Sequence, residues 1–173
     1  MKIRRLEPED DRSGFQSGNA DLDRFFIRYA GQNQFRHHIG TTYVAVDEEG
    51  RIAGFATVTP SEILSERLRV NQRKGFPGYP LPVLRLARLA VDRRAQGRGV
   101  GRQLLNAMLA LARQLALAVG CIGVVVDAKP DAVSFYEGLG FAELEATFGQ
   151  LGDRPEPVPM FLALAAIPVR TAP

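Results

Sequence analysis

VDRRAQGRGVGRQLL, residues 91–105, places three glycines two residues apart and surrounds them with four arginines. An apolar, strand-like segment precedes this stretch, and an amphipathic helical pattern follows it. The first turn of a helix carries backbone N–H groups that lack internal partners, and the helix dipole adds positive potential there. Glycine lets the backbone approach an anion closely because it has no Cβ. The stretch therefore predicts a strand-to-helix turn that binds phosphate.

Two common phosphate-binding motifs do not fit this turn. The ATP-type loop requires G-x-x-x-x-G-K-[ST], which does not occur in the chain. The dinucleotide fingerprint G-x-G-x-x-G fails because its sixth position is Arg102 when counted from Gly97 and Leu104 when counted from Gly99. The spacing that fits is Q-x-x-G-x-G, which residues 96–101 provide as QGRGVG.

Hydrophobic periodicity predicts alternating strands and helices along the chain. Strands are expected at residues 2–6, 40–47, 51–60, 83–91, 121–128 and 159–165. Helices are expected at residues 20–33, capped by Ser17 or Asn19, at 100–118 and at 130–141. Glycine and proline between residues 61 and 82 favour a loop or lid after one or two helical turns. This order predicts a mixed sheet with helices on its faces, in the α/β or α+β class.

Length and composition favour one globular domain spanning residues 1–173, because 173 residues can bury a sizeable core. There is no apolar run of about 18 residues to predict a membrane span, and the N-terminus lacks the apolar segment of a signal peptide. Cys121 is the single cysteine, so an internal disulfide is excluded and a small core residue is expected. These features together favour a cytoplasmic protein.

Basic residues are concentrated in the middle of the chain, although its net charge is only +3. Residues 61–113 contain 11 Lys and Arg against 3 Asp and Glu, whereas residues 114–173 contain 3 against 7. This local excess of positive charge predicts an anionic partner, and a solvated basic face without a partner is the alternative.

QGRGVG resembles the pyrophosphate loop of the GNAT superfamily, the Gcn5-related N-acetyltransferases, which bind acetyl-CoA. A second stretch, AVSFYEGLGF at residues 132–141, is similar to the A-x-x-F-Y-x-x-x-G-F signature of the same family. The resemblance covers most of the chain. It implies the GNAT fold, with a mixed sheet of about six to seven strands flanked by about four helices. It also implies an acetyl-CoA-dependent N-acetyltransferase that uses no metal.

The resemblance implies a role for particular residues of the chain. The backbone of the fourth strand, at Leu89, Ala90 and Val91, is expected to pair with the thioester carbonyl and the pantetheine amides, in an opening beside the fifth strand. The turn is expected to bind the rest of the cosubstrate through Arg94, Gln96, Gly97, Arg98, Gly99, Val100, Gly101 and Arg102.

Tyr136 is expected to be the general acid, which protonates the departing thiolate after direct attack by a primary amine. A phenol pKa of about 10 lies close enough to a thiol pKa of about 8.5 for useful proton transfer. A tyrosine that only packs in the core or against CoA is the alternative.

The sequence does not assign a general base. Glu62, Glu66, His37 and His38 are candidates, but each also fits a solvated surface residue, and the amine can lose its proton through water. Many family members carry an asparagine after the fifth strand that holds pantetheine. The corresponding stretch here is VDAKP, residues 126–130, which lacks it.

Two stretches narrow the choice of acceptor. FQSGNADLDRFFIRYAGQNQ, residues 15–34, and RLAVDRRAQGRGVGRQLL, residues 88–105, resemble the GNAT toxins of bacterial toxin–antitoxin pairs. That group acetylates the α-amino group of aminoacyl-tRNA and is neutralised by a small ribbon-helix-helix antitoxin. Eight basic residues are the candidates for phosphate contacts: Arg67, Arg69, Arg73, Lys74, Arg85, Arg88, Arg93 and Arg94.

Two other functions fit the same sequence. One is a stand-alone acetyltransferase of a small-molecule amine or of a peptide or protein amine, and the other is an inactive acyl-CoA-binding module. Homodimers are common in the resembling family, and the apolar stretch at residues 159–168 either pairs across such a dimer or closes the sheet.

Overall fold

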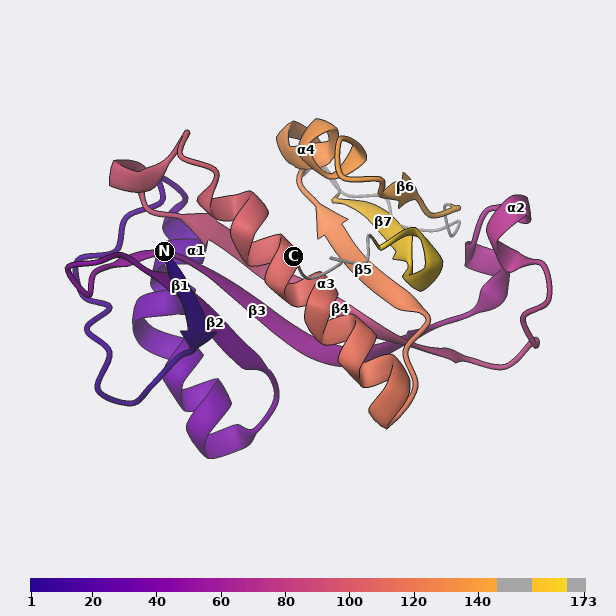
Figure 1. Ribbon diagram of the computed structural model, residues 1–173, viewed down its shortest axis with the longest axis horizontal. Coiled ribbons are helices and arrows are strands. Elements are labelled where there is room, and N and C mark those ends of the chain that lie inside the picture. The colour runs from indigo at the N-terminus through magenta and orange to yellow at the C-terminus, as the bar shows by residue number, and fades with distance from the viewer. Residues whose placement is uncertain (146–156, 168–173) are drawn as a thin grey trace, which may run out of the picture. The chain divides into compact units, whose positions relative to one another are not determined.

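The computed structural model describes residues 1–145 and 157–167 (Figure 1). Within the described residues seven strands form one mixed sheet in the order β1-β2-β3-β4-β5-β7-β6, in agreement with the predicted mixed sheet of about six to seven strands. The chain divides into two compact units, residues 1–59 with 86–111 and residues 60–85 with 112–173. The strands β3 (Ile52–Ile63) and β4 (Leu81–Val91) and the helix α3 (Val100–Ala118) each run through both units.

The first unit begins with three antiparallel strands. β1 (Lys2–Arg5) pairs with β2 (Thr41–Val46), and β2 pairs with β3. The turn between β2 and β3 is closed by Asp47, whose carboxylate accepts hydrogen bonds from the backbone N–H and the Nε of Arg51. The strands expected at residues 40–47 and 51–60 are separated only by the short turn EEG, which predicts an antiparallel hairpin, and the structure confirms it.

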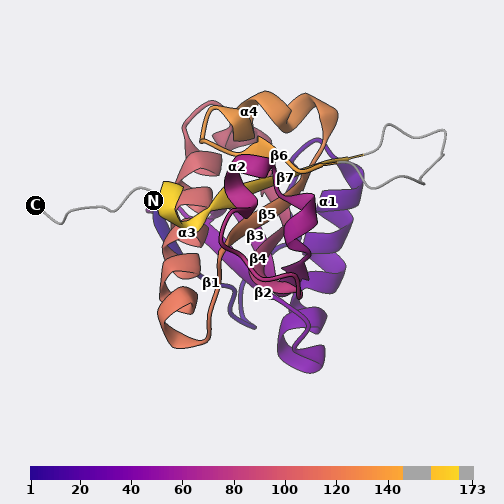
Figure 2. The ribbon, with the colours of Figure 1, turned by 90° about the vertical axis from the view of Figure 1, so that its right-hand side faces the viewer.

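The predicted helix at residues 20–33 is longer in the structure and mostly π-helical. It starts as α1 (Ala20–Arg24) and continues through the π-helical segments η1 (Phe25–Tyr29) and η2 (Gln32–His37). Asn19 is the N-cap, because its side chain accepts the N–H groups of Asp21 and Leu22 at 3.1 Å each. Figure 2 shows this helix and α3 on opposite sides of the strands of the first unit.

The long helix α3 has the bounds that the periodicity predicts. Its buried residues are Val100, Leu104, Leu105, Met108, Leu109 and Ala112. The helical periodicity places Leu111 and Leu115 on one face with Val100, Leu104 and Met108, but both are only half-buried. The apolar stripe is therefore rotated slightly from the one that the sequence suggested.

The second unit contains β5 (Gly123–Ala128), β7 (Val158–Ala163) and the two-residue strand β6 (Ala142–Glu143). β7 lies between β5 and β6 and is antiparallel to both. The remaining elements of this unit are η3 (Ser65–Arg67), α2 (Val70–Arg73), η5 (Pro130–Ala132), α4 (Val133–Glu137) and η6 (Leu164–Ala166). β6 was not predicted, because two residues carry no periodicity.

Two local predictions of the second unit can be compared with the structure. The helix predicted at residues 130–141 is shorter, since a 3-10 turn precedes α4 and Gly138 is the C-cap. Cys121 is a buried core residue, as expected, and its Sγ donates to the carbonyl of Gly123.

No helix within residues 1–145 and 157–167 is long and apolar enough to cross a membrane.

Candidate functional site

The glycine-rich turn joins β4 to α3 within the first unit, through the short 3-10 segment η4 (Arg93–Ala95). Gly97 and Gly99 have φ angles of +74° and +76°, in the left-handed region that favours glycine. A Cβ built at either position meets no described atom within 4 Å. Glycine is therefore required by the backbone conformation, and the turn has open space beside it for a ligand.

The helix that follows the turn offers backbone donors to an anion. The N–H of Gln103 donates to the carbonyl of Gly99, so the N–H groups of the three preceding helical residues lie ahead of this bond. The first turn of α3 contains no acidic residue that would compensate the helix dipole. These donors, together with the left-handed glycines, fit a pyrophosphate.

A buried carboxylate anchors the turn. Asp92 is 2% exposed, and its Oδ1 accepts the backbone N–H of Arg94 at 3.0 Å and the Nε of Arg94 at 2.8 Å. Its Oδ2 accepts the Nη2 of Arg94 at 3.0 Å and the backbone N–H of Gln16 at 3.1 Å. Hydrogen bonds from the Arg94 side chain lower the pKa of Asp92 to about 2, against the opposing effect of burial. Asp92 was not singled out from the sequence.

The side chain of Gln96 holds the turn from its other end. Its Nε2 donates to the carbonyl of Ser17 at 2.8 Å and to the carbonyl of Val91 at 3.1 Å. The backbone N–H of Arg93 donates to the carbonyl of Gln16 at 2.8 Å. The turn is thus fixed to a segment that lies far away in the sequence.

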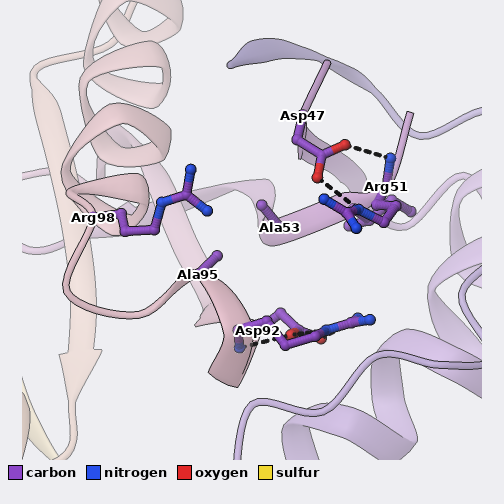
Figure 3. A pocket seen from close by; sticks show the side chains of 8 residues that line it. Asp47, Arg51, Ala53, Asp92, Ala95 and Arg98 are labelled. Carbon is purple, nitrogen blue, oxygen red and sulfur yellow. Dashed lines mark hydrogen bonds and ion pairs between the residues drawn. The ribbon is translucent and has the colours of Figure 1, made fainter. Parts of the chain in front are cut away.

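A small cavity of about 80 Å³ lies beside the turn (Figure 3). Arg51 pairs with Asp47 at 2.9 Å on one side of it, and Arg94 pairs with Asp92 at 2.8 Å on another. The side chain of Arg98 extends from the turn toward Ala53 and Ala95. Arg98 forms no ion pair within the described part of the chain, so its charge is available to an anion.

The fourth strand ends beside this turn. Ala90 is buried, whereas Leu89 and Val91 are half-buried. The N–H of Asp92 donates to the carbonyl of Ala53, which continues the pairing of β4 with β3. The expected pairing of Leu89, Ala90 and Val91 with pantetheine stays a prediction.

Tyr136 lies in α4, within the second unit, and is 5% exposed. Its ring makes edge contacts with Phe135 and Phe141, whose centroids lie 5.1 and 5.4 Å from its own. Burial raises the pKa of Tyr136 to about 12, so the phenol is protonated at neutral pH.

The candidate bases are all exposed. His37 contacts the side chain of Gln32, and His38 caps η2 with a φ of +53°. Glu62 and Glu66 form no ion pair within residues 1–145 and 157–167.

No group of three His, Cys, Asp or Glu side chains in this described part is arranged to hold a metal ion.

These features define an acetyltransferase, and the chain belongs to the acetyltransferase (GNAT) domain family, which it matches over residues 15–160. Among its relatives, a tRNA-acetylating toxin of Mycobacterium tuberculosis (strain ATCC 25618 / H37Rv) is 32% identical over 139 residues, which are 80% of this chain and 82% of that protein. AtaT complexed with acetyl-methionyl-tRNAfMet superposes with a TM-score of 0.82 at 26% identity and covers 96% of each chain.

A further solved structure is similar to the chain. A mutant of KacT in which one tyrosine is replaced by phenylalanine superposes with a TM-score of 0.81 at 26% identity, again over 96% of each chain. The family membership confirms the resemblance that QGRGVG and AVSFYEGLGF indicated, and acetyl-CoA is the cosubstrate of the chain.

Proposed function

We propose that the chain transfers the acetyl group of acetyl-CoA to the α-amino group of aminoacyl-tRNA, as a toxin of a bacterial toxin–antitoxin pair. The observation that carries this proposal is the 32% identity to a tRNA-acetylating toxin over 80% of the chain. The likeness to AtaT, which was solved with acetyl-methionyl-tRNAfMet, supports it. The resemblance of residues 15–34 to the start of such toxins points the same way.

The glycine-rich turn holds the cosubstrate in this proposal. The backbone N–H groups of Gly97, Gly99 and the first turn of α3 bind the pyrophosphate, and Arg98 adds charge beside them. Bound acetyl-CoA supplies the acetyl group as a thioester. The chain then has to orient the incoming amine and to give a proton to the leaving thiolate.

Tyr136 is the proposed proton donor. Its phenol stays protonated at neutral pH because burial raises its pKa to about 12. A thiolate beside it in the same apolar surroundings also gains proton affinity, which offsets the mismatch between phenol and thiol. The similar protein KacT was solved as a mutant in which one tyrosine is replaced by phenylalanine, which supports a role for a tyrosine in the proposed reaction.

Phosphates of the tRNA are proposed to contact the basic residues that the fold leaves available. Several candidates are already engaged: Arg85 pairs with Asp127 at 2.7 Å, Arg73 with Glu145 at 3.3 Å, and Arg88 lies 3.8 Å from the centroid of the Phe25 ring. Three others are exposed and have no ion pair within the described residues, namely Arg69, Lys74 and Arg93, whereas Arg67 is half-buried. These three are the preferred phosphate contacts.

The same proposal covers the partners and the place of action. A small ribbon-helix-helix antitoxin neutralises the protein, residues 1–173 act as one acetyltransferase domain, and the protein works in the cytoplasm, where charged tRNA is used. Two copies pair as a homodimer.

The experiment that tests the function uses the purified chain, acetyl-CoA and a panel of tRNAs, each charged with a different amino acid. Hydrolysis of the ester bond and mass spectrometry then identify any N-acetyl amino acid. We expect acetylation of one or a few charged tRNAs and none of the uncharged tRNA. Acetylation of free amines or peptides with no reaction on any charged tRNA would assign the chain to the small-amine or peptide class instead.

A further inference from the structure

The segment Gln16–Gly18, which immediately precedes the cap of α1, contacts the glycine-rich turn through both backbone and side chains. Gln16 uses its N–H with Asp92 and its carbonyl with the backbone of Arg93. The carbonyl of Ser17 accepts from Gln96. Gly18 has a φ of +95°, and a Cβ there would lie 3.0 Å from the Nε of Arg93, so the Arg93 side chain lies directly against this glycine.

We propose that Asp92 and Gln96 are positioning residues, which fix the glycine-rich turn on the Gln16–Gly18 segment in the conformation that binds pyrophosphate. The inference rests on the proposed role of the turn as the acetyl-CoA site. It changes the expected role of Gln96 from a ligand of the cosubstrate to a clamp of the turn. It also gives the FQSG stretch, residues 15–18, a function in cosubstrate binding.

The hydrogen-bonding capacity of both side chains supports a positioning role. A primary amide has two N–H donors, and the Nε2 of Gln96 already serves two carbonyls, those of Ser17 and Val91. Asp92 is a buried carboxylate whose two oxygens accept four hydrogen bonds. A negative carboxylate would repel a pyrophosphate, so Asp92 can assist binding only through the groups that it holds.

The turn needs such support because of its glycines. Gly97 and Gly99 give the backbone the left-handed conformation, but glycine also loses more conformational freedom on ordering than any other residue. A turn ordered in advance presents its N–H donors without that cost at the moment of binding. Loss of the clamp should therefore weaken the recognition of the pyrophosphate specifically.

The segment Gln16–Gly18 also contacts the start of the helix at residues 20–37, which begins with α1. The hydroxyl of Ser17 donates to Asp23 at 2.5 Å, and Asn19 caps α1. The segment therefore holds both the glycine-rich turn and the first turn of this helix.

The test compares two acetyl donors, acetyl-CoA and S-acetylpantetheine, which lacks the pyrophosphate. Asp92→Asn and Gln96→Ala are measured beside Asp21→Asn, which breaks an exposed Asp–Arg pair in α1 and serves as the matched control. Calorimetry gives the Kd of acetyl-CoA, and steady-state kinetics gives kcat/KM for both donors. Thermal unfolding confirms that each variant is folded at the assay temperature.

We expect Asp92→Asn and Gln96→Ala to weaken acetyl-CoA binding at least about tenfold. The preference of the enzyme for acetyl-CoA over S-acetylpantetheine should fall by a similar factor, because only one donor carries the pyrophosphate. Asp21→Asn should keep the wild-type preference. An unchanged Kd in both folded variants, or an equal loss with both donors, would overturn the inference.

The positioning role of Asp92 and Gln96 and the proposed tRNA acetylation can fail independently of each other. If the wild-type chain binds acetyl-CoA but acetylates no charged tRNA, the tRNA proposal fails and the calorimetric comparison still decides the role of Asp92 and Gln96. If the wild type acetylates tRNA while both variants bind acetyl-CoA normally, only the positioning role is lost.

Discussion

The aromatic rings of Phe26 and Phe55 stack face to face, with centroids 4.3 Å apart and an angle of 5° between their planes. Both side chains are fully buried, and Phe15 meets each of them edge-on. This cluster joins the helix at residues 20–37 to the strand β3 within the first unit. It should dominate the stability of that unit.

Phe55→Ala is expected to lower the free energy of unfolding by about 3–5 kcal/mol, because it removes a large buried side chain and leaves a cavity. Chemical denaturation followed by circular dichroism measures this change. Phe35→Ala, at a ring that is 40% exposed, is the matched control and should change stability by less than about 1 kcal/mol. Similar losses in both variants would argue against the cluster as the centre of the core.

Tyr136→Phe is expected to lower kcat at least tenfold, since general acids contribute about 10²–10⁴-fold to turnover. The Kd of acetyl-CoA should stay close to the wild-type value, because the substitution removes only the hydroxyl. Steady-state kinetics and calorimetry give the two quantities, and Tyr29→Phe, at an exposed tyrosine, is the control. A normal kcat would leave Tyr136 with a packing role alone.

Gly99→Ala is expected to weaken acetyl-CoA binding, because a Cβ disfavours the left-handed backbone by about 1–2 kcal/mol. Gly50 has nearly the same φ, +79°, and the same open surroundings, but it lies in the turn between β2 and β3. Gly50→Ala should therefore cost similar stability and leave the Kd unchanged. Equal effects of the two substitutions on binding would contradict the placement of the pyrophosphate at the turn.

Acid is expected to lower the free energy of unfolding by protonating Asp92 and breaking its ion pair with Arg94. The pKa of Asp92 is about 2 in the folded protein, below the value of about 3.9 for a free carboxyl, so the pair stabilises the fold above pH 4. That contribution, about 2 kcal/mol, is lost as the pH falls from about 4 to 2. Asp92→Asn should flatten the dependence of unfolding free energy on pH in this window, measured by denaturation at a series of pH values. A wild-type slope in the variant would mean that other carboxyls cause the acid sensitivity.

Binding of tRNA should depend on salt if phosphates are the main contacts. Lys74→Ala is expected to weaken tRNA binding and to reduce the slope of log K against log salt by about one unit. Filter binding of uncharged tRNA at several salt concentrations measures this slope. Lys2→Ala, at the start of β1, removes one charge outside the proposed contacts and should leave the slope unchanged.

Local patterns predicted most of the elements because strands and helices are built from short-range periodicity. The bounds of α3 agree with the sequence, and the β2–β3 hairpin lies where alternation and a glycine turn placed it. β6 escaped prediction because its two residues are defined only by partners on β7. The continuation of the first helix to His37 as a π-helix has no signature in the periodicity.

The glycine-rich turn could be predicted from the sequence, whereas the hydrogen bonds that hold it on the segment Gln16–Gly18 could not. Q-x-x-G-x-G is a local motif, but Asp92 and Gln96 find their partners 76 and 79 residues earlier in the chain. The pKa of Tyr136 likewise depends on burial that arises only in the folded protein. One local signal could have suggested the buried carboxylate of Asp92. Asp92 directly follows an apolar strand, and Arg94 lies two residues after it.

The position of β1 has a consequence for the behaviour of the protein at high concentration. β1 is the terminal strand in the order of the sheet, and it carries Lys2, Arg4 and Arg5 within four residues. A second copy that extended the sheet at this edge would bring the same cations face to face. Arg4 is paired with Asp10, but Lys2 and Arg5 still oppose the pairing of two copies at this edge, so self-association of the chain is expected at a different surface.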